Sequence, residues 1–228
     1  MSENTPPKAF NPMPPVVVAL FGLIAGTELL FTFAGTGILG NPDGIGWRYA
    51  AIESYGVNTS LIGWMIETNK YPLEHLARFV SFSFLHSSMI NTAVACALFL
   101  AMGKMVGTAF SAVAVLVFFF ASAAAGAVCY SLAVPEGGWL FGSFTGIYGL
   151  IGAYTFMIWV SLRVQNAPQG QAFYLIAILM GVQLGFGMIL GDNNSWIADL
   201  TAFVTGFILA FFFVPGGFGS VLALFRRP

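Results

Sequence analysis

Six long apolar stretches dominate this chain, and they constrain its fold more than any other feature of the sequence. The hydrocarbon core of a bilayer is about 30 Å thick, and about 20 apolar residues of α-helix are enough to cross it. The six stretches cover residues 16–33, 79–102, 110–134, 141–160, 172–190 and 196–214. The sequence therefore predicts an all-α integral membrane protein with six transmembrane helices.

Composition excludes several other classes of protein. Apolar residues make up 58% of the chain and charged residues 7%, whereas a soluble domain carries about 25% charged residues. There are too few charges to cover a surface that faces water. The formal net charge of −1 argues against nucleic acid as a partner, because nucleic-acid binding requires a clustered basic face. The partner that the composition indicates is the lipid bilayer.

One connection between the apolar stretches is much longer than the others. It runs from about residue 35 to residue 78 and contains Trp47, Trp64 and Pro72. A connection of this length usually has structure of its own, so we expect short interfacial helices there. The predicted organisation is a tail at residues 1–15, a membrane domain at 16–214 and a second tail at 215–228.

The distribution of Lys and Arg predicts the orientation, because cytoplasmic loops of membrane proteins carry an excess of these residues. With the N-terminus inside, the inner segments contain Lys8, Lys104, Arg163, Arg226 and Arg227. The outer segments then contain Arg48, Lys70 and Arg78, all in the long connection. We therefore expect both termini in the cytoplasm and the long connection outside.

The sequence indicates neither a disulfide framework nor a metal or cofactor site. Its two cysteines, Cys96 and Cys129, both lie in apolar stretches. Free cysteine behaves as a small hydrophobic residue and is often buried, so we expect two unpaired thiols.

Two acidic residues, Glu28 and Asp199, lie inside the apolar stretches. Ionisable groups at membrane depth are costly and usually face the protein interior. They could form a proton or ion path, or each could be protonated or hydrogen-bonded to a neighbouring helix. We favour the second interpretation, because no further acid repeats at helical spacing along one span. The other polar candidates are His86, Asn91, Thr145 and Gln183.

Small residues recur every three or four positions in the fourth and sixth stretches. Such stripes let helix backbones approach closely in lipid, so we expect these two helices to lie deep in the bundle. The stripes are Gly142, Gly146, Gly149 and Ala153 in the fourth stretch, and Ala198, Ala202, Gly206 and Ala210 in the sixth.

Three motifs, in the same order along the chain, resemble those of the rhomboid family of intramembrane serine proteases. They are Phe84-Leu85-His86, the run 149–153 (Gly-Leu-Ile-Gly-Ala), and Ala198-Asp199 followed by Ala202 and Gly206. Segments 10–15 and 215–227 resemble alphaproteobacterial members in particular. The resemblance implies a six-helix rhomboid-like bundle with a long structured first outer loop, in a bacterial inner membrane.

The resemblance also implies that the family's catalytic groups are missing. Phe144 stands where the family has its nucleophilic serine, and Asp199 where it has the catalytic histidine. Asn91 stands at the position of a second histidine of the oxyanion site, and Ala95 at that of an asparagine. His86 matches a family histidine to which we assign a structural role.

These replacements predict a pseudoprotease. A phenyl ring has no nucleophilic atom, and a carboxylate with a pKa near 3.9 is a weak base at neutral pH. Ser143 and Thr145 offer hydroxyls, but one residue along a helix is a turn of about 100°, so neither points where the family serine points. We expect a remnant cluster that includes Thr145, Tyr148 and His86. In it Tyr148 is the first candidate partner for Asp199, with Asn91 or Thr145 second.

Three functions are compatible with the sequence. The first is binding or scaffolding of a transmembrane client, with the chain acting alone or as an accessory subunit of a larger membrane complex. The second is residual proteolysis by a non-standard nucleophile, Ser143 or Thr145. The third is ion or proton transport through Glu28 and Asp199.

Overall fold

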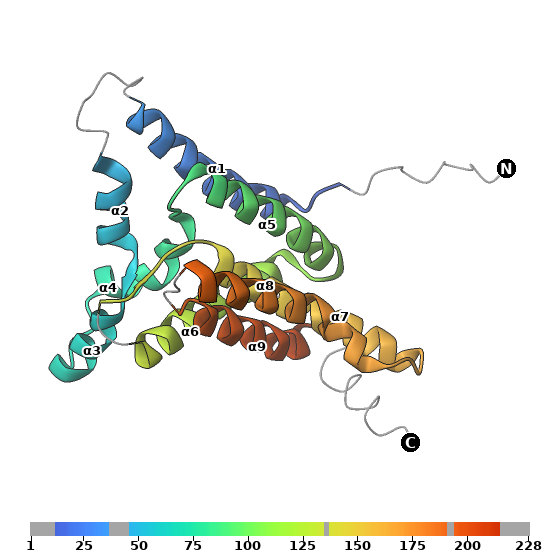
Figure 1. The fold of residues 1–228 in the computed structure, drawn as a ribbon. Coiled ribbons are helices and arrows are strands. Elements are labelled where there is room, and N and C mark those ends of the chain that lie inside the picture. The colour runs from blue at the N-terminus through green and yellow to red at the C-terminus, as the bar shows by residue number, and fades with distance from the viewer. Residues whose placement is uncertain (1–11, 37–45, 135–136, 191–193, 215–228) are drawn as a thin grey trace.

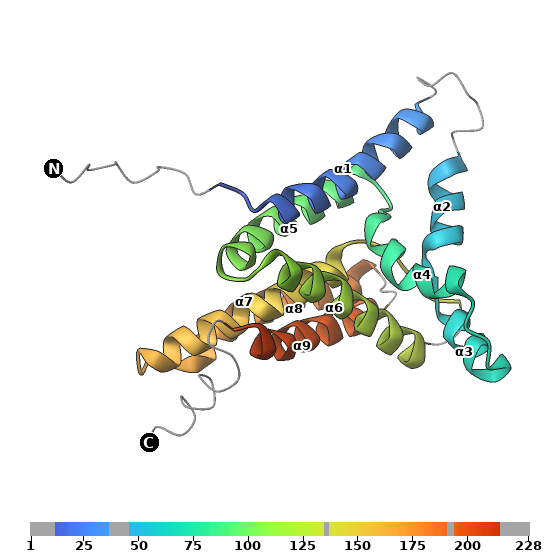
Figure 2. The same ribbon diagram turned by 180° about the vertical axis from the view of Figure 1, so that it is seen from behind.

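The structure is a computed structural model that describes residues 12–36, 46–134, 137–190 and 194–214. Within these residues, five helices are long and apolar enough to cross a membrane. They are α1 (Pro15–Gly35), α5 (Met89–Ala109), α6 (Ala112–Ala133), α7 (Phe144–Val164) and α9 (Trp196–Phe213). Figures 1 and 2 show them from opposite sides. The chain is thus a multi-pass membrane protein.

The fifth predicted span corresponds to a shorter helix. After the 3-10 helix η3 (Gln169–Phe173), α8 covers Tyr174–Leu190, which is 17 residues. At 1.5 Å per residue its length is about 26 Å, a few ångströms less than a typical hydrocarbon core. The structure therefore supports five spans by length, and the predicted count of six is not established by it.

The prediction for the second span began ten residues too early. Residues 79–81 complete the short helix α4 (Leu73–Ser81), and a 3-10 turn, η2 (Phe82–Phe84), follows it. The spanning helix α5 begins only at Met89, where the side chain of Ser88 accepts a hydrogen bond from the Asn91 N–H at 3.3 Å. Such an N-cap satisfies a backbone donor that the helix itself cannot satisfy. His86 therefore lies in the loop before α5 and not inside a span.

Among the described residues between α1 and α5, three short α-helices are present. They are α2 (Trp47–Tyr55), α3 (Thr59–Thr68) and α4, and they gather at one end of the bundle in both views (Figures 1 and 2). Two short strands, β1 (Val57–Asn58) and β2 (Trp139–Leu140), pair antiparallel. This pair ties the segment between α1 and α5 to the segment that leads into α7.

Helix α7 occupies the centre of the bundle. It packs most extensively on α9, and also on α6 and α5, while α1 lies mainly against α5 (Figures 1 and 2). Residues 145–153 of α7 are all buried. Because these residues contact three helices at once, the first half of α7 sets the positions of the side chains around it.

Glycines allow this close packing. A Cβ added to Gly206 of α9 would collide with the backbone of Gly149 in α7, and one added to Gly149 would collide with Phe118 and Ser122 in α6. A Cβ on Gly146 would meet the Phe119 ring. Ala202, the neighbouring small residue of α9, is fully buried.

Gly142 differs from the other members of the predicted stripe. It precedes α7, has φ of +115°, and an added Cβ there would meet only ordinary contacts. Glycine is required at this position because other residues rarely adopt positive φ. The interpretation of Gly142 as a helix-packing residue is therefore replaced by a conformational role in the turn into α7.

We predict that Gly206→Ala destabilises the protein by about 1–3 kcal/mol, the range for overpacked cores, because the two helix backbones must separate. Gly22→Ala in α1 is the control, since an added Cβ there meets nothing within 4 Å. Unfolding in detergent, followed by heat or by titration with a denaturing detergent, measures the difference. Equal stability of the two variants would contradict the packing role of Gly206.

Candidate functional site

Three of the four positions where the resemblance predicts lost catalytic groups line one pocket. The pocket has a volume of about 420 Å³, and Asn91, Phe144 and Asp199 all contribute to its wall. They come from α5, α7 and α9, which are far apart in sequence. The fourth position, Ala95, is fully buried in the core of the bundle. The fold thus gathers the predicted positions in space.

Asp199 is held by hydrogen bonds from two other helices. Thr145 Oγ1 donates to its Oδ1 at 2.9 Å, and Gln183 Nε2 donates to its Oδ2 at 2.8 Å. Asp199 lies in the first turn of α9 and is 3% exposed. A buried carboxylate is tolerated where hydrogen bonds replace its water.

The Tyr148 hydroxyl hydrogen-bonds Gln183 and not Asp199, although the sequence made Tyr148 the first candidate partner of Asp199. Its hydroxyl donates to Gln183 Oε1 at 3.1 Å, and Gln183 in turn reaches Asp199. The direct partner on α7 is Thr145, which the sequence made a second choice. The sequence identified Gln183 only as a polar residue in a span. Its contact with Asp199 was not predicted, because that contact depends on how α8 packs against α9.

The remaining hydroxyl near Phe144 belongs to Ser143, and it faces His86. His86 Nε2 lies 3.0 Å from Ser143 Oγ and accepts a hydrogen bond from the Ser143 N–H at 3.3 Å. Burial lowers the pKa of His86 to about 4, so the imidazole is neutral near pH 7 and can accept these bonds.

This serine–histidine pair has no access to the pocket. Ser143 is 0% exposed and His86 is 1% exposed, and neither belongs to the pocket wall. The pair satisfies polar groups at the start of α7 and joins the loop before α5 to that helix. His86 is therefore separate from the Asp199 cluster in which the sequence had placed it, and its contacts fit a structural role.

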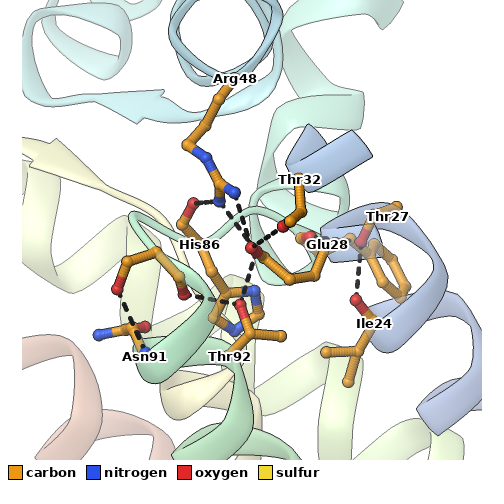
Figure 3. A network of polar contacts seen from close by, with 10 residues as sticks. Ile24, Thr27, Glu28, Thr32, Arg48, His86, Asn91 and Thr92 are labelled. Carbon is orange, nitrogen blue, oxygen red and sulfur yellow. Dashed lines mark hydrogen bonds and ion pairs between the residues drawn. The ribbon is translucent and has the colours of Figure 1, made fainter. Parts of the chain in front are cut away.

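A second polar cluster surrounds Glu28 of α1 (Figure 3). Arg48 of α2 donates to both carboxylate oxygens of Glu28, at 2.8 and 2.6 Å, and also to the His86 carbonyl oxygen at 2.7 Å. Thr32 and Thr92 donate to the same carboxylate at 3.0 and 2.7 Å. The hydrogen bond to Glu28 raises the pKa of Arg48, so Arg48 remains charged.

The Glu28 cluster connects four segments of the chain: α1, α2, the loop before α5, and α5 itself. The sequence identified Glu28 as a costly acid but counted Arg48 only as a loop charge. The bidentate ion pair between Arg48 and Glu28 depends on how α2 is placed beside α1. The sequence contains no direct indication of that placement. The cluster favours the structural interpretation of Glu28 over an ion path.

Both cysteines are free, as predicted, with Cys96 buried and Cys129 half-buried. Among the described residues, no three His, Cys, Asp or Glu side chains come together as potential metal ligands.

The chain matches a known protein family. A family model described as the Rhomboid domain matches residues 73–216, which is more than half of the chain. No curated protein matches the sequence. The matched region begins at α4 and includes every residue of the pocket wall.

We predict that Arg48→Met destabilises the protein by about 3 kcal/mol or more, because it leaves a buried carboxylate without its cation. Glu28→Leu combined with Arg48→Met should cost less than the sum of the two single changes, since the pair is then removed together. Unfolding free energies of the four proteins measure this coupling. Strictly additive losses would show that the ion pair contributes nothing specific.

Proposed function

Because the chain belongs to the rhomboid family, whose members are normally intramembrane serine proteases, we propose that it is a catalytically inactive member that binds transmembrane segments of partner proteins. The observation that carries this proposal is the composition of the pocket wall. A phenyl ring and a hydrogen-bonded carboxylate stand at the two positions where the family resemblance predicts a nucleophile and its base.

The chemistry of the wall supports inactivity. Covalent catalysis requires a nucleophile with a general base in hydrogen-bond reach. Phe144 has no such atom, and the Asp199 carboxylate accepts hydrogen bonds from Thr145 and Gln183. Ala95, at a further family position, has no polar side-chain atom.

The shape of the pocket supports binding. Its apolar wall includes Leu98 of α5 and Leu179 and Val182 of α8, so α8 borders the pocket together with α5, α7 and α9. Helix α8 packs mainly on η3 and α9, and Ile178 and Val182 are more than half exposed. An apolar pocket bordered by a lightly packed helix suits a hydrophobic segment that arrives from the bilayer.

For the membrane arrangement, we propose that α8 serves as a sixth span despite its length and that both termini are cytoplasmic. The short helices α2, α3 and α4 then lie at the outer interface, and the membrane is the bacterial inner membrane. The excess of Lys and Arg in the segments assigned to the inside supports this orientation.

A photo-crosslinking residue at Leu179 or Val182 should capture a partner polypeptide in native membranes, because both side chains line the pocket. The matched control is Ile178, which is adjacent in α8, 64% exposed and not part of the pocket wall. A discrete adduct from the pocket positions alone is the expected result. Equal capture at all three positions, or capture at none, would contradict the proposal.

Residual proteolysis is the second candidate, and the contact between Ser143 and His86 is the observation that favours it. Both side chains are buried away from the pocket, so we expect no serine-specific labelling by a fluorophosphonate probe. Ser143→Ala and Thr145→Val are the control variants. Labelling of the unmodified protein that disappears in Ser143→Ala would establish an active serine and overturn the assignment as inactive.

Transport through Glu28 and Asp199 has no comparable support. Glu28 is neutralised by Arg48, and Asp199 belongs to a separate cluster on α7, α8 and α9.

A further inference from the structure

The hydrogen bonds around the pocket are distributed unevenly over its wall. On the side formed by α7, α8 and α9, polar side chains hydrogen-bond one another, with Gln183 at the centre. On the side of α5, the wall contains the Ser87 hydroxyl and the Asn91 amide. Within the described part of the chain, neither of these two side chains has a hydrogen-bond partner. The α5 side of the pocket is therefore able to bind a polar group from elsewhere.

Asn91 directs its side chain to the pocket, whereas its neighbour Thr92 belongs to a different cluster. The Thr92 hydroxyl donates to Glu28 at 2.7 Å (Figure 3), and Asn91 lines the pocket. The cap at Ser88 uses only the backbone N–H of Asn91, so it leaves the side-chain amide unoccupied. That amide offers two N–H donors and one carbonyl acceptor.

The pocket side of α5 is polar at the end of the helix and apolar further along it. Asn91 is the third residue of α5, and Ser87 comes just before the N-cap residue Ser88. Leu98 also lines the pocket and is seven residues after Asn91. Seven residues are close to two helical turns, so Leu98 lies on the same face, about 10 Å further along the axis. A transmembrane segment beside this face would meet the amide near its own end and Leu98 along its apolar part.

An amide side chain on such a segment would complement Asn91. Two amides can exchange hydrogen bonds in both directions, because each has donors and an acceptor. Hydrogen bonds from Asn and Gln side chains stabilise the association of transmembrane helices. An apolar side chain at the same place would displace water from Asn91 and leave its donors and acceptor unsatisfied, which is costly. The Asn91 amide therefore distinguishes one kind of segment from another.

We propose that the pocket selects transmembrane segments that carry Asn or Gln near the end level with Asn91, and that this side chain hydrogen-bonds the Asn91 amide. The inference rests on the proposed function and adds to it the chemical class of the partner. The apolar wall accommodates the segment, and Asn91 discriminates among segments.

Synthetic transmembrane peptides test this selection against the full chain in lipid nanodiscs. Each is a Leu/Ala helix of about 20 residues, enough to cross the bilayer. The first has Asn near the end level with Asn91, and the matched peptide has Leu there, which is similar in size but has no polar atom. A third has the Asn near the opposite end. A fourth has Gly-Gly at the first position, which exposes backbone amides without a side-chain amide. Fluorescence transfer from labelled peptide to labelled protein measures affinity.

We expect the first Asn peptide to bind about three-fold to ten-fold more tightly than the Leu peptide, the range expected for a hydrogen bond between transmembrane helices. The preference should disappear in Asn91→Leu, which keeps the backbone N–H that the cap uses. It should persist in Gln165→Met, which removes an exposed amide at the other end of α7. The peptides with Asn at the opposite end or with Gly-Gly should show no advantage over the Leu peptide.

Equal affinity of the first Asn peptide and the Leu peptide for the unmodified protein would overturn this inference but leave the proposed function in place. This comparison needs no variant, so it decides the matter even if Asn91→Leu folds poorly. A preference that survives in a folded Asn91→Leu protein would also overturn the inference, as would an equal gain from Gly-Gly or from Asn at the opposite end. If none of the peptides binds, both the inference and the proposed function fail.

Discussion

The close approach of α7 to α9 is the contact on which the site depends. A Cβ on Gly206 would collide with the backbone of Gly149, and one on Gly152 of α7 would collide with the backbone of Phe203 in α9, so the two helix backbones lie in direct contact. At this separation Thr145 on α7 lies within 2.9 Å of Asp199 on α9. Gly126 of α6 contributes from the other side, because a Cβ there would meet both the Thr145 side chain and the Ala198 carbonyl oxygen. The packing of the helices therefore sets the positions of Thr145 and Asp199. The hydrogen bond between them is not needed to hold the helices together.

The two buried acids, Glu28 and Asp199, are stabilised against the cost of burial in different ways. Glu28 has a cation, Arg48, that reaches it from outside the spanning helices and joins it to the loop before α5. Breaking such a pair leaves an uncompensated charge, which makes it a strong constraint on the structure. Asp199 receives hydrogen bonds from the neutral groups of Thr145 and Gln183 and faces a pocket. Both acids therefore join separate segments of the chain, Glu28 through an ion pair and Asp199 through hydrogen bonds that link α9 to α7 and α8.

Hydropathy predicted most of the fold, because spanning helices are defined by length and apolar content, both of which are local properties. It misplaced the start of α5, since Phe79, Phe82 and Phe84 continue the apolar run although they belong to α4 and η2. The cap at Ser88 was the local signal that could have located the boundary.

The hydrogen-bond partners of Asp199 were harder to predict than the helices. Tyr148 and Thr145 are both on α7, and only the rotation of that helix against α9 decides which one faces the carboxylate. The contacts of Gln183 with Asp199 and of Arg48 with Glu28 depend on how distant segments pack together. A single sequence contains no direct information about that packing.

The pocket remains open although a bulky side chain contributes to its wall. Here Phe144 adds a bulky ring to the wall, yet a pocket of about 420 Å³ remains beside it. Polar side chains from α5, α7 and α9 still face this space, and α8 borders it with an exposed apolar surface. This open volume beside α8 is the feature on which the proposed binding of a transmembrane segment rests.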